Sequence, residues 1–107
     1  MNDIIFKLSA SYLKALSHPT RLKILDILKD EELCVCKIFE ALELEQSNVS
    51  QHLRVLKDQG ILVSRREGAN IMYRVKDKDV FNIVNKVKEI LIRQLNETQD
   101  LLEKEGD

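Results

Sequence analysis

The segment from Gln46 to Gly60, QSNVSQHLRVLKDQG, most constrains the fold, because apolar and polar residues alternate in it at helical spacing. Val49, Leu53 and Leu56 recur at i, i+4 and i+7 and form an apolar stripe that a core must cover. Gly60 follows a lysine in the last turn, which is a common way for a helix to end. The segment therefore predicts one amphipathic helix.

The opposite side of this helix carries hydroxyls, an amide and a guanidinium, and it has no carboxylate. Arg and Gln side chains reach base edges in the major groove of DNA, and Ser binds phosphates or bases. For such a segment taken alone, a solvated helix face is the alternative. The residues that share this side are Ser47, Ser50, Gln51 and Arg54.

Residues 61–76 are expected to form a β-hairpin, because two short β-rich runs are joined across Gly68-Ala69. Arg65 and Arg66 lie near the predicted tip, and Arg74 lies on the return strand. A basic-tipped hairpin directly after a helix of this kind is the winged helix-turn-helix arrangement, and it favours DNA binding. The two runs are Ile61–Glu67 and Asn70–Val75.

Residues 34–60 are expected to form the helix-turn-helix. Val35–Leu42 has the pattern of a short helix, and Glu43-Leu44-Glu45 is a connection of the length that such motifs use. Asp30, Glu31 and Glu32 are expected to mark a turn and an acidic start to this short helix, which would suit its dipole.

Two more helices are expected at the start of the chain. Residues 3–16 keep apolar side chains at helical spacing. Ser17 then offers an N-cap, and Pro19 stands early in the next helix, where proline is tolerated. That second helix is apolar around much of its circumference and is expected at the centre of the core.

Residues 77–103 predict a long last helix. Its apolar stripe is longer than the core of a 107-residue chain can cover, and the first helix has the same excess. We therefore expect the helices 3–16 and 77–103 to pair with a second copy across a two-fold axis. The stripe consists of Val80, Val84, Val87, Leu91 and Leu95.

These elements make a mainly α-helical domain with a small β-hairpin, and residues 1–107 are expected to form one domain. The net charge of −1 is unevenly distributed. Residues 46–76 hold six basic and two acidic side chains, for a local charge of +4, whereas residues 26–45 carry −5. A basic stripe on an acidic body suits double-stranded DNA as a partner, with salt-sensitive affinity.

Other classes of protein are disfavoured. The chain has no apolar run of about 18 residues and no signal pattern, so we expect no membrane partner and a cytoplasmic location. G-x-S-x-G, H-E-x-x-H, C-x-x-C and a glycine-rich phosphate loop are absent, so neither an enzyme nor an organic cofactor is expected. An interaction adaptor built on a winged helix is the remaining alternative.

With these residues laid out, the sequence resembles the ArsR/SmtB family of metal-responsive repressors. The resemblance lies in ALSHPTRLKIL (15–25), ELCVCKI (32–38), QSNVSQHLRVL (46–56) and REGANIMYRV (66–75). It implies a dimeric winged-helix repressor that is released from its operator when an inducer binds. The positions that match the family's operator contacts are Gln46, Ser47, Ser50 and Gln51.

Cys34 and Cys36 are the chemistry-bearing cluster. Thiolates select soft ions such as As(III), Cd(II), Pb(II) or Zn(II), and a helix N-terminus favours the thiolate. Residues i and i+2 of a regular helix point about 200° apart. Both sulfurs can therefore bind one ion only if the first turn is distorted or unwound. Such a change would link ion binding to the neighbouring helix at Gln46–Gly60, which resembles the family's DNA-recognition helix.

The resemblance also shows departures from the family's metal sites. Phe39 stands where the arsenic box has a third cysteine, and the N-terminal arm offers no cysteine. Of the zinc site on the last helix, Asp77-Lys78-Asp79 keeps one half, while Ile90 and Arg93 fall where the other ligands belong, so that site is expected to be absent.

Three interpretations of Cys34 and Cys36 stay open: a thiophilic metal or metalloid sensor, a site of oxidation or persulfidation, or two small buried apolar residues in a regulator with another signal. His18 and His52 are expected to serve in capping or DNA contact rather than as metal ligands.

Overall fold

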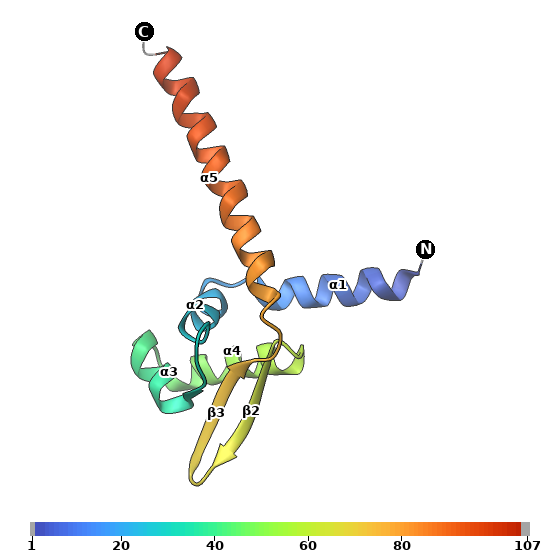
Figure 1. The fold of residues 1–107 in the computed structure, drawn as a ribbon, viewed down its shortest axis with the longest axis vertical. Coiled ribbons are helices and arrows are strands. Elements are labelled where there is room, and N and C mark those ends of the chain that lie inside the picture. The colour runs from blue at the N-terminus through green and yellow to red at the C-terminus, as the bar shows by residue number, and fades with distance from the viewer. Residues whose placement is uncertain (1, 106–107) are drawn as a thin grey trace. The chain divides into compact units, whose positions relative to one another are not determined.

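The computed structural model describes residues 2–105, which form five helices and a three-stranded antiparallel sheet (Figure 1). The expectation of a mainly helical winged helix-turn-helix is confirmed. The chain divides into two compact units, one ending at Asp77 and the other beginning at Lys78. The elements are α1 (Asp3–Leu16), α2 (Pro19–Ile27), β1 (Leu33–Cys34), α3 (Val35–Leu42), α4 (Gln46–Asp58), β2 (Leu62–Glu67), β3 (Asn70–Val75) and α5 (Val80–Glu105).

The core of the first unit lies where α2 meets α3 and α4, and where α4 meets β2. Ile24 and Leu25 of α2 are fully buried, as the apolar character of that helix predicts. Burial of apolar side chains is the main stabilising term in a fold of this size. The other fully buried side chains of this unit are Leu28, Ile38, Val49, Leu53, Leu56, Ile61 and Leu62.

The hairpin of β2 and β3 has the register that its joining Gly68-Ala69 turn predicts, with Leu62 opposite Val75 and Glu67 opposite Asn70. Gly68 has φ +62°, a left-handed conformation in which glycine is unstrained. A third strand, β1, pairs with β3 and was not predicted. Two residues are too few to show the alternation by which strands are recognised.

Two helix starts differ from expectation. His18, rather than Ser17, is the N-cap of α2, because its Nδ1 accepts a hydrogen bond from the Thr20 backbone N–H at 3.1 Å. Ser17 instead closes α1, where its hydroxyl donates to the Lys14 carbonyl oxygen at 2.7 Å. The predicted acidic start of α3 is also wrong. Its first turn contains no acid, because β1 separates Glu32 from it.

The end of α4 fixes where the hairpin begins. Gly60 has φ +71°, and its N–H donates to the Lys57 carbonyl oxygen at 2.9 Å. The N–H of Ile61 donates to the Leu56 carbonyl oxygen at 3.0 Å, which completes the Schellman pattern of helix termination. Since Ile61 and Leu56 are both buried, β2 leaves α4 in a defined direction.

Helix α5 begins at Val80, three residues later than expected, because residues 78 and 79 form a turn whose carbonyl oxygens accept from Phe81 and Asn82. Of the stripe expected to pair with a second copy, Val80 is buried and Val84 is half-buried in the single chain, whereas Val87, Leu91 and Leu95 are 50%, 51% and 69% exposed. In the first unit, α1 likewise exposes Ile4, Ile5, Phe6 and Leu8.

Candidate nucleic-acid interface and cysteine site

Helix α4 presents two opposite faces, as its sequence predicts. Val49, Leu53 and Leu56 are at most 1% exposed, and they anchor the helix in the core. The face away from the core lies in solvent. The expectation that this face has no carboxylate is wrong, because Asp58 lies one turn after Arg54 on the same side of α4. The predicted DNA-contacting positions, all exposed, are Gln46, Ser47, Ser50, Gln51 and Arg54.

Arg54 is the one cation among these five positions, and its only partner among the described residues is a weak one. Its Nε lies 3.9 Å from an Asp58 carboxylate oxygen, and both side chains are more than 70% exposed. Exposed ion pairs of this kind contribute little and are easily exchanged. The guanidinium is therefore available to another acceptor, such as a base edge or a phosphate.

The wing, defined as residues 61–76, carries Arg65 and Arg66 on adjacent positions of β2. Successive side chains of a strand point to opposite faces, so the two guanidinium groups lie on different sides of the sheet. Arg66 is exposed, and no hydrogen bond or ion pair of its side chain is found within residues 2–105.

Arg65, in contrast, forms hydrogen bonds and ion pairs with carboxylates of the same chain. Its Nε donates to both carboxylate oxygens of Glu32, at 3.0 and 3.1 Å, and its Nη2 donates to Glu67 at 2.9 Å. The hydrogen bond from Arg65 holds the pKa of Glu32 below its ordinary value, with added attraction from Arg65 and Arg74. The structure thus places this predicted DNA contact in an intramolecular ion-pair network.

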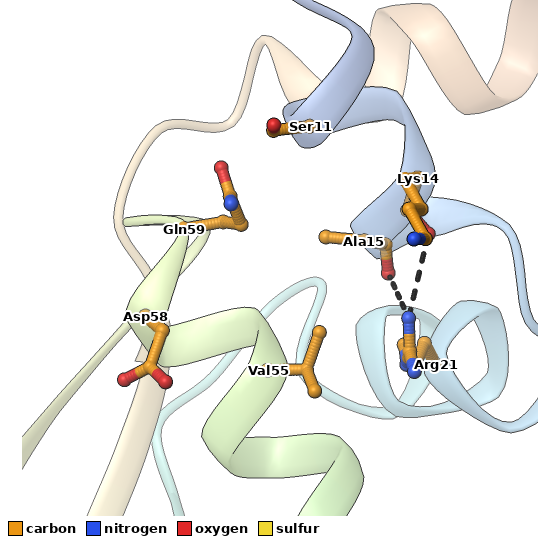
Figure 2. Close-up of a pocket in the computed structure, with 7 residues that line it drawn as sticks. All are labelled: Ser11, Lys14, Ala15, Arg21, Val55, Asp58 and Gln59. Carbon is orange, nitrogen blue, oxygen red and sulfur yellow. Dashed lines mark hydrogen bonds between the residues drawn. The ribbon is translucent and has the colours of Figure 1, made fainter. Parts of the chain in front are cut away.

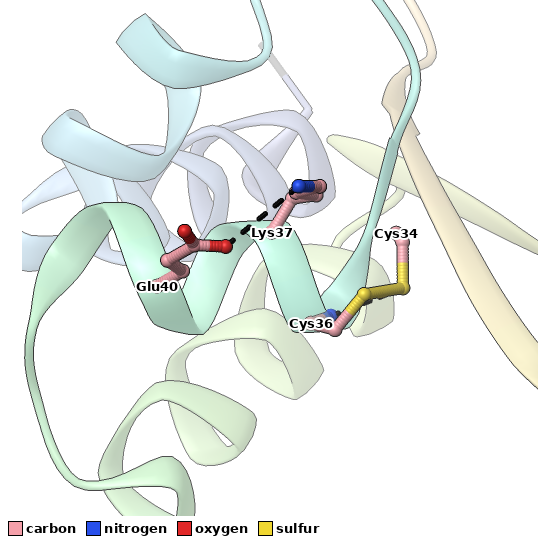
Figure 3. Close-up of a disulfide and its surroundings, with 4 residues drawn as sticks. All are labelled: Cys34, Cys36, Lys37 and Glu40. Carbon is pink, nitrogen blue, oxygen red and sulfur yellow. Dashed lines mark hydrogen bonds and ion pairs between the residues drawn. A yellow bond between two sulfur atoms is a disulfide. The ribbon is translucent and has the colours of Figure 1, made fainter.

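Cys34 and Cys36 come together because Cys34 lies just before α3 and has an extended backbone. Cys34 ends β1 and is the N-cap of α3, with φ −60° and ψ 144°, so the extended backbone at Cys34, rather than an unwound first turn of the helix, lets the two sulfurs meet. The two sulfurs are joined as a disulfide at the start of α3 (Figure 3). The Cys36 N–H also donates to the Cys34 sulfur at 3.2 Å.

The exposure of the cysteines argues against one of the three interpretations, that of two small buried apolar residues. Cys34 is half-buried and Cys36 is exposed, so the pair does not consist of two small buried apolar residues. Farther along α3, Lys37 and Glu40 form an exposed ion pair at 3.8 Å (Figure 3). Of the two cysteines, Cys36 is therefore the more accessible to reagents from solvent.

Thiolates are ligands that soft ions prefer, but Cys34 and Cys36 form a disulfide here, so the pair could offer two thiolates to such an ion only after reduction. The pair does not complete a site, since no three His, Cys, Asp or Glu side chains within residues 2–105 are placed to hold a metal. The described part of one chain thus supplies two ligands.

His52, on α4, is held by α2 rather than exposed toward a ligand. Its Nδ1 accepts a hydrogen bond from the Arg21 Nε at 3.1 Å, and its ring centroid lies 4.2 Å from that of His18. The expected capping role of His18 is confirmed, whereas His52 joins two helices. Partial burial, followed by the nearby His18 and Arg21, lowers the pKa of His52.

A groove of about 350 Å³ lies between α1, α2 and the end of α4 (Figure 2). The Arg21 Nη1 donates across it to the carbonyl oxygens of Lys14 and Ala15, at 3.4 and 3.3 Å. Arg21 thereby joins the end of α1 to α4 through His52. The groove is lined by Ser11, Lys14, Ala15, Arg21, Val55, Asp58 and Gln59.

Sequence reasoning missed Arg21 and Glu32, the two residues that connect elements by charged hydrogen bonds. Neither stands in a spacing that indicates its partner: Arg21 lies 31 residues from His52, and Glu32 lies 33 residues from Arg65. An acidic run beside a basic hairpin was the available signal for Glu32, but such a pattern does not specify which carboxylate meets which cation.

Comparison with known proteins identifies the family. The model of bacterial regulatory proteins of the arsR family matches residues 18–64. An uncharacterised HTH-type transcriptional regulator of Mycobacterium tuberculosis, Rv0081, is 32% identical over 103 residues, which cover 95% of this chain and 90% of the relative. The chain belongs to the ArsR family. Its relatives in this family are DNA-binding transcriptional regulators rather than enzymes.

Solved structures of similar chains have the same fold. The crystal structure of Rv0081 superimposes with a TM-score of 0.77 over 87% of this chain and 94% of that one. The homodimeric winged helix-turn-helix domain of Mb0332 from Mycobacterium bovis, a possible ArsR-family regulator, is 30% identical. It has a TM-score of 0.77 and covers 89% of this chain and 88% of its own.

One relative is named for a metal. The CadC homolog of Staphylococcus aureus, a cadmium resistance transcriptional regulatory protein, is 42% identical over 78 residues, which cover 72% of this chain and 64% of that relative.

No helix within residues 2–105 is long and apolar enough to cross a membrane.

Proposed function

We propose that this ArsR-family chain is a cytoplasmic repressor that binds a near-palindromic operator as a homodimer. The observation that carries the proposal is the exposed polar face of α4, which the turn at Gly60 joins directly to the basic wing. In a two-fold dimer, the two copies of α4 would enter successive major grooves about 34 Å apart.

The side chains divide into two roles. Gln51 and Arg54 are long enough to reach base edges, and Gln and Arg form the bidentate contacts that distinguish bases. Ser47 and Ser50 bind phosphates or bases, and Gln46 joins them at the start of the helix. Arg66 contributes a phosphate contact, which adds affinity without adding sequence preference.

The dimer would form through α1 and α5. Each helix exposes a run of large apolar side chains, and exposed apolar patches of this extent mark association surfaces. The homodimeric state of the Mb0332 domain supports the same assembly here.

Cys34 and Cys36 are the proposed inducer site. A thiophilic ion such as Cd(II), As(III), Pb(II) or Zn(II) would be held by both thiolates, with its remaining ligands from outside the described residues. Similarity to the CadC homolog, which is named for cadmium resistance, supports such an inducer. Because Cys34 caps α3, a change at the sulfurs alters the start of the helix-turn-helix.

Thiol oxidation is the second candidate signal, and the disulfide between Cys34 and Cys36 favours it. In that reaction the two thiols lose two protons and two electrons to an oxidant such as a peroxide, and one S–S bond forms while the oxidant is reduced. Both signals act at the same cap of α3.

Two substitutions test the proposed DNA interface on a duplex taken from upstream of the protein's own gene. Gln51→Ala should weaken specific binding by about 1–3 kcal/mol and leave binding to random DNA nearly unchanged. Arg66→Ala should weaken both and reduce the salt slope by about 1. Fluorescence anisotropy at several salt concentrations measures both effects. If neither substitution changes affinity, α4 and the wing do not contact DNA.

A further inference from the structure

The ion pair between Glu32 and Arg65 joins the segment before α3 to the proposed DNA-binding wing. Two distances of 3.0 and 3.1 Å join the Arg65 Nε to the carboxylate oxygens, and Arg65 Nη2 also donates to Glu32. The Glu32 side chain is 24% exposed, compared with 52% for Arg65. The carboxylate is therefore the more enclosed member, and the guanidinium remains partly open to solvent.

The sheet explains why these two residues meet. Leu33 and Cys34 pair with Tyr73 and Met72 of β3, so β1 holds the segment that carries Glu32 along the wing. Met72 in turn lies opposite Arg65 on β2. Side chains that are directly opposite across strands share one face of a sheet. One face of the sheet therefore carries a row of three neighbouring side chains, Cys34, Met72 and Arg65. Glu32 precedes Cys34 by two residues.

The chemistry of this contact resembles that of a phosphate contact. A carboxylate presents two oxygens to the guanidinium fork, and a DNA phosphate uses the same fork geometry. Each N–H of Arg65 that donates to Glu32 is withdrawn from an external anion. Arg66, one residue away, has no such partner within residues 2–105.

We propose that Glu32 competes with DNA phosphate for the Arg65 guanidinium, so that the wing contributes fewer phosphate contacts than its arginines could supply. The proposal rests on the DNA-binding function proposed for the wing. It assigns Glu32 as a residue that limits DNA affinity, and it explains why a carboxylate is paired with a basic residue of the wing.

The test compares Glu32→Gln with Glu31→Gln, which removes the same charge from an adjacent exposed carboxylate. Glu32→Gln should raise affinity for random and operator DNA by about two- to fivefold, the change expected for losing a partly exposed ion pair. It should also steepen the salt slope by about 1, because one more phosphate is neutralised. Glu31→Gln should change affinity less and leave the slope unaltered.

Two further variants separate competition from other effects. Glu32→Asp keeps the net charge but shortens the side chain, so it should also raise affinity. In an Arg65→Ala background, Glu32→Gln should have no more effect than Glu31→Gln. Circular dichroism melts identify any variant that has lost its fold, and the remaining variants then decide the result.

Opposite outcomes overturn the proposal. Weaker DNA binding by Glu32→Gln would mean that Glu32 positions Arg65 for DNA, and equal gains from both Gln variants would mean a general charge effect. In either case wild-type DNA binding would stand and only the role of Glu32 would fall. Absence of wild-type binding to any duplex would instead overturn the proposed function together with this inference.

Discussion

Arg21 and His52 show how one polar contact can hold the recognition helix. The Arg21 Nε donates to the His52 Nδ1, which must be unprotonated to accept. The groups that face this imidazole are the guanidinium of Arg21 and the ring of His18, and neither stabilises a positive charge there. Burial and these two neighbours lower the pKa of His52 in the folded protein.

This contact predicts a pH dependence of stability. Because the folded pKa lies below the unfolded value, the unfolded chain binds the proton first, and stability falls as pH drops below about 6.5. The loss is complete once pH falls below the folded pKa. Melting temperatures should therefore decrease from pH 7 to pH 5, and they should decrease less in His52→Gln, whose amide oxygen still accepts from Arg21.

Two carboxylates with shifted pKa values, Glu32 and Glu89, do not obscure this measurement. Glu32 and Glu89 have pKa values below the ordinary range because of hydrogen bonds from Arg65 and Lys86, so they titrate at lower pH. A decrease of the same size in His52→Gln would show that His52 does not cause it.

Helix α4 and the hairpin could be predicted from the sequence because both depend on local periodicity. The buried stripe of α4 and the Gly68-Ala69 turn each specify their own element. The strand β1 and the Glu32–Arg65 pair could not be predicted, because they depend on which distant segments meet. The disulfide depends on the extended backbone at Cys34, and the spacing of the two cysteines does not by itself specify whether Cys34 lies inside or before the helix.

Helix α5 gives a prediction about assembly. Leu91 is 51% exposed in the single chain, and the proposed dimer buries it against a second copy. Leu91→Glu should place an unpaired charge in the dimer interface and destabilise the dimer by about 3–5 kcal/mol. It should therefore yield monomers or insoluble protein. Analytical ultracentrifugation without metal or DNA measures this.

A matched control lies on the same helix. Asn96→Glu introduces the same charge at an exposed position on the side of α5 away from the apolar stripe. Steps of about 100° per residue place it roughly 140° around the helix from Leu91. This variant should remain dimeric. A well-behaved wild-type monomer at micromolar concentration would rule out the proposed assembly.

The first unit brings the cysteine pair and the proposed DNA surface together within one small structure. Cys34 belongs at once to the sheet of the wing, through its pairing with Met72, and to the start of α3 as its cap. Helix α3 packs on α2, and α2 packs on α4. A change in the bonding of the sulfurs therefore affects a strand that pairs with the wing and a helix that is connected to α4 through α2.

Titration of a preformed complex between reduced protein and upstream duplex tests the sensing claim most directly. Cd(II), As(III), Zn(II) or a peroxide is added, with wild type compared with Cys34→Ser/Cys36→Ser by anisotropy. At least one reagent should lower wild-type affinity about 5- to 150-fold, a coupling of roughly 1–3 kcal/mol, while the double variant keeps its dimer and its DNA. If the double variant releases DNA equally well, the signal does not enter through these cysteines.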